Sequence, residues 1–191
     1  EYIEHILALR AELVRSMSKG QVDPTHTIAN PRAEVEAALE ELNRLGDQTG
    51  SDRALTLLAR LAFFEGKAAK SFEIANRLTE RASLTRRQRQ ELAANMNTAA
   101  YFGALTLGEA FRAMERAGEV VGASLTGEAM NLRTMSGLFG MAGRFEEARV
   151  SAERSAQLFG ELGTPMRHIM SIQMVAETER LAGRLEEAER L

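Results

Sequence analysis

The sequence contains no cysteine and no tryptophan, and it has few aromatic residues of any kind. Without cysteine the chain can form no disulfide, and it has no thiolate for catalysis or metal binding. Only 5 % of its residues are aromatic, so a core must be built from Ala, Leu, Met, Val and Ile. Proline occurs only three times in 191 residues, and Ala and Leu are strong helix formers. We therefore predict an all-α protein.

The charge and the hydropathy of the sequence argue against further classes of protein. The net charge is −3 at pH 7, so the chain has no overall positive field that would attract nucleic acid or an anionic membrane. No apolar run approaches the roughly 20 residues that a membrane-spanning helix needs. The first five residues include two glutamates and do not resemble a signal peptide. We expect a cytoplasmic location, with no membrane partner and no nucleic acid bound by this segment.

The chain also lacks the usual patterns of an active site. The three histidines lie far apart in the sequence, without the spacing of metal ligands: His5, His26 and His168. We expect His168 to be exposed. The series Gly137, Gly140 and Gly143 falls at the end of a predicted helix, so it indicates close packing and a helix C-cap and not a phosphate loop. We predict no catalytic residues, no metal site and no cofactor.

What the sequence does contain is an internal repeat. Residues 142–148 read Ala-Gly-Arg-Phe-Glu-Glu-Ala, and the nearly identical stretch at residues 182–188 reads Ala-Gly-Arg-Leu-Glu-Glu-Ala. Two fainter copies precede them. The matching position holds a small residue in each copy, at spacings of 39, 38 and 40: Ser71, Ala110, Ala148 and Ala188. A small residue at a fixed phase allows the second helix of each pair to approach the first closely.

Helix signals agree with this phasing. The predicted C-caps are glycines: Gly20, Gly46, Gly66, Gly143, Gly163 and Gly183. The predicted N-caps are Asn30, Ser51, Thr85, Thr126 and Thr164, where Asn30 and Thr164 precede proline and Thr85 has Gln88 at a capping-box spacing. The predicted helices cover about 2–18, 31–45, 51–65, 67–83, 86–107, 109–122, 127–142, 145–162, 165–182 and 185 onward.

These helices suggest two parts. Residues 1–46 form an N-terminal helix pair or cap with a loop at 20–30, and residues 47–191 form four helix pairs. The chain begins without methionine and reaches Leu191 inside a helical pattern. We therefore expect it to be a fragment of a longer protein, with the last pair truncated.

The turns at 143–148 and 183–188, with weaker versions at 66–71 and 107–110, resemble the tetratricopeptide-repeat superfamily over roughly residues 51 to 191. The resemblance implies a right-handed α-solenoid of antiparallel helix pairs. The family pattern has a period of about 34 residues, with Trp and Tyr in the first helix. Here the period is longer and Trp is absent, although Tyr101 and Phe139 stand about where the aromatic residue belongs.

The longer period, with Gly-Glu-Leu-Gly-Thr-Pro at 160–165 between two pairs, resembles the helical arrays of large bacterial regulators. These include signal-transduction ATPases, LuxR-type activators and some cyclases, in which such an array implies a sensor or assembly role beside a separate effector domain. HEAT-like arrays of similar period are the competing architecture. The acidic-acidic-Ala turns favour the tetratricopeptide interpretation.

A solenoid presents the inner face of each first helix on a concave surface. An Arg side chain there can form two hydrogen bonds with a carboxylate, and Asn or Gln can pair with backbone amides. We therefore expect a protein or peptide partner, such as an acidic segment or a helix. Ordinary solvated polar residues are the competing interpretation. The predicted partner-binding residues are Arg53, Thr56, Arg60, Asn95, Phe102, Arg133, Gln173, Glu177 and Arg180.

The leading hypothesis is a non-catalytic interaction module or scaffold, as part of a larger regulatory protein. The alternative is a sensing domain that controls an attached effector in signalling or transcription regulation, and an enzyme of unrecognised type ranks last. Met166, Met170 and Met174 share one helix face, which indicates core packing between neighbouring repeats. A homodimer through the exposed end of the array is an additional partner hypothesis.

Overall fold

The computed structural model describes residues 30–81, 84–103, 105–121 and 124–191. The helix expected at 2–18, nearly all of the loop at 20–30, and the residues His5, Gly20 and His26 lie outside this part of the chain. Within it, nine helices follow one another and no strand is present. The all-α prediction is therefore confirmed for the described residues.

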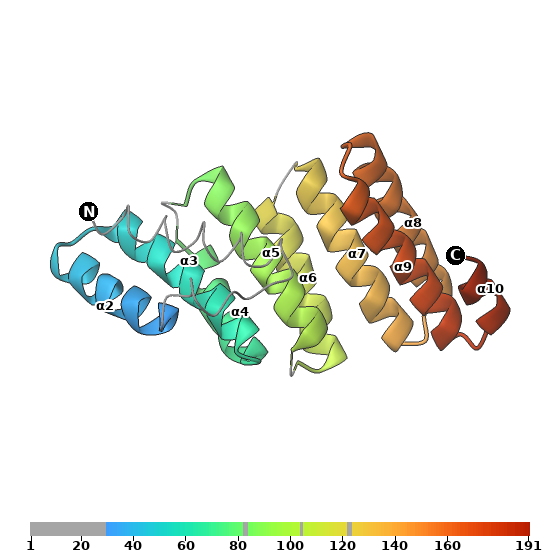
Figure 1. Cartoon of the computed structure of the whole chain (residues 1–191), viewed down its shortest axis with the longest axis horizontal. Coiled ribbons are helices and arrows are strands. Elements are labelled where there is room, and N and C mark those ends of the chain that lie inside the picture. The colour runs from blue at the N-terminus through green and yellow to red at the C-terminus, as the bar shows by residue number, and fades with distance from the viewer. Residues whose placement is uncertain (1–29, 82–83, 104, 122–123) are drawn as a thin grey trace.

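The helices are arranged along the long axis of the molecule, with α2 at one end and α10 at the other (Figure 1). They are α2 (Pro31–Arg44), α3 (Gln48–Phe64), α4 (Ala68–Thr79), α5 (Arg86–Phe102), α6 (Leu107–Val121), α7 (Leu125–Met141), α8 (Phe145–Glu161), α9 (Pro165–Leu181) and α10 (Leu185–Arg190).

Each helix packs against the next one in the chain. In addition, α3, α5, α7 and α9 contact one another in that order, so they form a continuous layer. We call these four the first helices, and α4, α6, α8 and α10 the second helices. All four first helices are 17 residues long, and they start at Gln48, Arg86, Leu125 and Pro165, which are nearly equal spacings. The repeat seen in the sequence is therefore a repeat of structure.

The turns between helices use glycine as predicted. Each described glycine of the predicted C-cap set has a positive φ, between 63° and 79°. At Gly143 φ is +75°, and a Cβ atom there would meet nothing within 4 Å. Glycine is thus needed for the left-handed backbone conformation and not for space.

The N-caps are confirmed in part. The Asn30 side chain caps α2, and Thr85 forms the predicted capping box with Gln88. Thr164 stands at the N-cap of α9, but its hydroxyl donates to the carbonyl oxygen of Phe159 instead of accepting from the helix. That hydroxyl therefore ties α9 to the end of α8.

Two predicted N-caps are wrong. The N-cap of α3 is Asp47 and not Ser51, and that of α7 is Ser124 and not Thr126. The Asp47 carboxylate accepts a hydrogen bond of 2.9 Å from the backbone of Gly50. Each of these helices therefore begins earlier, because an alternative capping side chain lies a short distance upstream.

Small side chains line the contact between layers. Ser71, Ala110 and Ala148 are at most 1 % exposed, which confirms the close approach predicted for the second helices. The central core, from α4 to α7, is aliphatic and includes Leu92 and Met96. No helix in the described ranges is both long and apolar enough to cross a membrane.

Candidate binding face on the first helices

Aromatic side chains gather at the C-terminal ends of α3 and α5. Phe102 is 66 % exposed and Phe64 is 48 % exposed. The Phe102 ring centroid lies 6.0 Å from that of Phe63 and 4.7 Å from that of Tyr101. Four of the ten aromatic residues of the chain therefore meet here, and we call them the aromatic cluster. Grouped and partly exposed aromatic side chains are typical of partner-binding surfaces.

Tyr101 extends the aromatic cluster onto α7. A Cβ atom at Gly137 would overlap the half-buried Tyr101 ring and would lie 2.8 Å from Cε of Met174. This confirms the close-packing role predicted for Gly137. Burial and, to a smaller extent, the charge of Glu177 raise the pKa of the Tyr101 hydroxyl. The hydroxyl therefore stays protonated at neutral pH.

Arg133 lies one helical turn before Gly137 and shares its face of α7. Its guanidinium is half-buried, and Nη1 lies 3.6 Å from Sδ of Met170. Among the described residues, no carboxylate lies within ion-pair distance of Arg133. Burial and the nearby positive charge of Arg167 lower its pKa, but a guanidinium remains charged in proteins. Within the described part of the chain, Arg133 is therefore a partly desolvated cation without a counter-charge.

Arg149 shows the opposite arrangement. Its Nε donates a hydrogen bond of 2.8 Å to Glu179, whose carboxylate is buried, and Arg184 donates to the same carboxylate. The two arginines lower the pKa of Glu179, with Arg184 the larger cause. Arg149 thus joins α8 to α9, and Arg184 ties the start of α10 to the same carboxylate. Arg133 has no such partner among the residues that the structure describes.

The predicted binding residues on α3 and the centre of α5 lie deeper than expected. Thr56 is buried and donates to the carbonyl oxygen of Asp52 at 2.8 Å. Asn95 is buried, and its Nδ2 has no hydrogen-bond partner among the described residues. The expected exposure of Thr56 and Asn95 is wrong, because α3 and α5 each have several helical neighbours. Arg53 and Arg60 are half-buried on α3.

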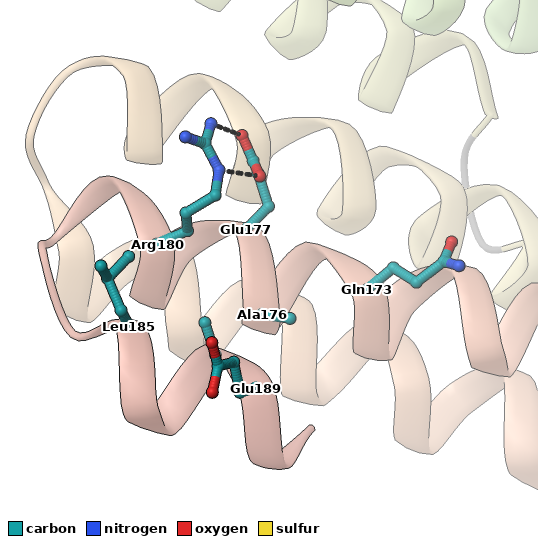
Figure 2. A pocket seen from close by; sticks show the side chains of 7 residues that line it. Gln173, Ala176, Glu177, Arg180, Leu185 and Glu189 are labelled. Carbon is teal, nitrogen blue, oxygen red and sulfur yellow. Dashed lines mark hydrogen bonds and ion pairs between the residues drawn. The ribbon is translucent and has the colours of Figure 1, made fainter.

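The three predicted residues of α9 meet at a pocket of about 390 Å³ between α9 and α10. Figure 2 shows Glu177 and Arg180 at one end of this pocket and Gln173 at the other. Arg180 donates two hydrogen bonds, of 2.7 and 2.6 Å, to Glu177. This pairing lowers the pKa of Glu177 and raises that of Arg180. Ala176, Leu185 and Glu189 also line the pocket.

Core packing was predicted for three methionines of α9, and this prediction is wrong for two of them. Met166 is 70 % exposed and Met170 is 42 % exposed, and Ile169 beside them is 52 % exposed. Ala129, the counterpart of Ile169 in the preceding repeat, is fully buried in a cluster that includes Phe159 of α8. α9 packs against α10 (Leu185–Arg190), and these three exposed side chains lie in the N-terminal half of α9.

His168 is also less accessible than expected. It is half-buried, and its Nδ1 donates a 2.8 Å hydrogen bond to the carbonyl oxygen of Ala156. This bond links α9 to α8. Within the described ranges, no three His, Cys, Asp or Glu side chains are grouped so that they could hold a metal ion.

Sequence reasoning missed most of the aromatic cluster, although the sequence contains its signal. Phe63-Phe64 and Tyr101-Phe102 are aromatic pairs at the ends of two successive first helices, and their spacing equals that between the helix starts. Aligning the ends of the first helices would have placed these pairs at equivalent positions. Arg167 and Glu189 were missed because only the fold brings them near Arg133 and the pocket, respectively.

The chain was compared with family models, curated proteins and solved structures. No family model, no curated protein and no solved structure matches the chain. The resemblance to tetratricopeptide repeats therefore stays a prediction.

Proposed function

We propose that this chain is a non-catalytic interaction module, a right-handed solenoid of tetratricopeptide type that binds a protein segment along its first helices. The regular spacing of the helix pairs, the continuous layer of first helices and the positive-φ glycines between helices support this architecture. The cytoplasmic location expected from the sequence is part of the proposal. Control of an attached effector, as in a sensor, stays a prediction.

The observation that carries this proposal is Arg133. Its half-buried guanidinium has lost part of its hydration and gains no ion pair from the described residues in exchange. Arg167 adds a second positive charge close by, which is again without an ion-pair partner among the described residues. An acidic side chain of a partner would neutralise this local charge. The expected ligand is therefore an acidic segment.

The aromatic cluster supplies the apolar part of the same face. Phe102 contacts Tyr101, Tyr101 packs against Gly137, and Gly137 lies about 6 Å along the helix from Arg133. An apolar anchor of a bound segment would pack on Phe102 while a neighbouring carboxylate reaches Arg133. Charge-assisted hydrogen bonds to a partly desolvated guanidinium are strong and directional, so they would fix the register of the segment.

A peptide-display selection on the immobilised chain tests this proposal. We expect the selected peptides to combine an aromatic or aliphatic residue with one or more Asp or Glu residues. The best peptide is then synthesised, and its affinity is measured by fluorescence anisotropy for the parent and for four variants.

Two variants alter the proposed face, and two are matched controls. Arg133→Glu should weaken binding by about tenfold or more, and Phe102→Ser by about fivefold. Arg154→Glu and Val150→Ser change exposed residues of α8 and should leave the affinity unchanged. Val150 is 64 % exposed and thus closely matches Phe102. If selected peptides bind all five proteins equally, or if no peptide is enriched, the proposal is wrong.

A further inference from the structure

The first helices can be compared position by position. They have the same length and nearly equal spacing, so residues at the same position in each helix are equivalent. Gly137 and Gly140 of α7, for example, correspond to Glu177 and Arg180 of α9. A feature that the repeat itself requires should recur at equivalent positions. A feature that occurs between only two of the first helices is a candidate for function.

Two arginines form such a feature between α7 and α9. Nη1 of Arg133 lies 3.6 Å from Sδ of Met170, and Arg167 precedes Met170 by three residues, which is about one helical turn. Met170 therefore lies next to both arginines. Burial and then the charge of Arg167 lower the pKa of Arg133, so the two guanidinium groups are electrostatically coupled. We call Arg133 and Arg167 the arginine pair.

Neither member of the arginine pair has a strong acceptor in the described part of the chain. The thioether of Met170, which Arg133 contacts, is only a weak acceptor. The Arg167 guanidinium lies 5.8 Å from the ring centroid of Phe159, which attracts the cation without neutralising it. Two positive charges therefore lie close together without a counter-charge among the described residues.

The repeat itself does not require the arginine pair. The equivalent positions between the earlier first helices are all uncharged: Thr56 with Gln88 between α3 and α5, and Ala94 with Gly127 between α5 and α7. Two like charges that lie close together also repel each other, which opposes folding. Stability therefore does not explain why both positions hold arginine between α7 and α9.

A dianion fits the arginine pair better than a single carboxylate does. One carboxylate carries a single negative charge, so it leaves one of the two guanidinium groups uncompensated. A phosphate monoester carries a charge of about −1.5 to −2 at neutral pH and has three acceptor oxygens on one atom, so two guanidinium groups can bind it together. Arginine also forms paired, charge-assisted hydrogen bonds with phosphate. The chemistry of the arginine pair therefore matches a phosphorylated side chain.

We propose that the arginine pair binds a phosphorylated residue of the partner segment, so that phosphorylation of the partner strengthens its binding to this chain. Recognition of the phosphate rests on the function proposed above, in which the same segment packs an apolar residue on Phe102. It adds to that function the modification that regulates binding.

Three versions of the peptide selected by display test this proposal. At the acidic position most sensitive to replacement by Ala, they carry serine, glutamate or phosphoserine. The affinity of each version is measured by fluorescence anisotropy for the full chain and for its Arg167→Gln and Arg154→Gln variants. Arg167 and Arg154 are both exposed, so the two variants should fold, and they change the net charge equally. Inorganic phosphate is tested as a competitor in a parallel titration.

The parent chain should bind the phosphoserine peptide about tenfold more tightly than the glutamate peptide, and the serine peptide most weakly. Arg167→Gln should reduce the preference for phosphoserine over glutamate to about twofold, because one guanidinium remains. Arg154→Gln should keep the parental preference. Inorganic phosphate should displace the phosphoserine peptide only at concentrations far above the Kd of the peptide, because it lacks the apolar anchor.

Three results would overturn phosphate recognition and leave the proposed function in place. The first is equal affinity of the parent chain for the phosphoserine and glutamate peptides. The second is an equal loss of preference in Arg167→Gln and Arg154→Gln, which would report net charge alone. The third is inorganic phosphate that binds as tightly as the phosphoserine peptide, which would make the arginine pair a site for a free anion.

A different result would remove both proposals. If Arg133→Glu leaves the affinity of the glutamate peptide unchanged, or if no peptide is enriched, the first helices do not bind an acidic segment. The effect of Arg133→Glu on the glutamate peptide therefore distinguishes failure of the proposed function from failure of phosphate recognition.

Discussion

The α7–α8 pair and the α9–α10 pair have one backbone plan and opposite surface chemistry. Where α9 covers α7, the equivalent positions hold glycine, and the nearby charge is neutralised across the interface by Arg149 and Glu179. Where the surface is open, Glu177 and Arg180 neutralise each other within one helix. The difference indicates that a covered surface uses small residues and a charge on its neighbour, whereas an open surface satisfies its charges internally.

The largest expected effect comes from replacing a glycine of the covered surface. In Gly137→Leu, the new side chain would run into the Tyr101 ring and Met174. We expect a loss of about 3 kcal/mol in the free energy of unfolding, at the upper end of overpacking costs. Urea denaturation followed by circular dichroism measures this loss.

The equivalent change on the open surface is Glu177→Leu. It removes an exposed ion pair, so it should cost less than about 1 kcal/mol. Similar losses for the two variants would show that the covered and open surfaces do not differ in packing.

A smaller effect is expected at the Arg149–Glu179 ion pair, which joins the α7–α8 helix pair to the α9–α10 helix pair. Glu179→Gln leaves Arg149 and Arg184 close together without the shared negative charge. Glu179 is 2 % exposed, and we expect a loss of about 2 kcal/mol at neutral pH. The control is Glu189→Gln on the open surface, which should change the free energy of unfolding by less than about 0.5 kcal/mol. Equal effects would contradict the assignment of Glu179 as a buried link.

The smallest expected effect is the pH dependence of the same link. The pKa of Glu179 in the folded chain lies below its ordinary value of 4.5, because Arg184 and Arg149 stabilise the carboxylate. The unfolded chain therefore takes up a proton first as the pH falls below 4.5, and the stabilisation is lost as the pH falls further through the folded pKa. Denaturation curves at about pH 5 and pH 3 should show that the parent loses more free energy of unfolding than Glu179→Gln does. Parallel losses would argue against this titration.

Much of the fold could be predicted from the sequence, because its signals are local. A glycine after a helix indicates a left-handed backbone conformation directly. The small residues at the repeat phase directly indicate where two helices approach closely. Some predicted helix boundaries were wrong, because the apolar spacing continued past the residue where the helix ends. The helix predicted at 86–107 ends at Phe102, since Gly103 takes an extended conformation, and the next helix starts at Leu107. Nothing in the apolar spacing distinguishes that break from a continuous helix.

The candidate site was harder to predict, because it depends on neighbours that are distant in the sequence. Periodicity placed Phe102 and Arg133 on the first-helix face but could not show that no carboxylate of the described ranges pairs with Arg133. It also placed Asn95 on that face, although the helices around α5 bury it. The methionine stripe failed for a related reason. Met166 and Met170 share a helix face with Met174, and the spacing of the three methionines does not show how much of that face the neighbouring helix α7 covers.

The turn at Gly143 has a consequence for chemical redesign of the array. Its backbone adopts φ +75°, and the space beside its α-carbon is empty within 4 Å. The requirement is therefore one of handedness alone. A D-alanine, which favours this conformation and restricts the unfolded chain, should stabilise the turn by up to about 1 kcal/mol. An L-alanine at this position would strain the backbone. The stability of semisynthetic variants should therefore depend on which enantiomer occupies the turn.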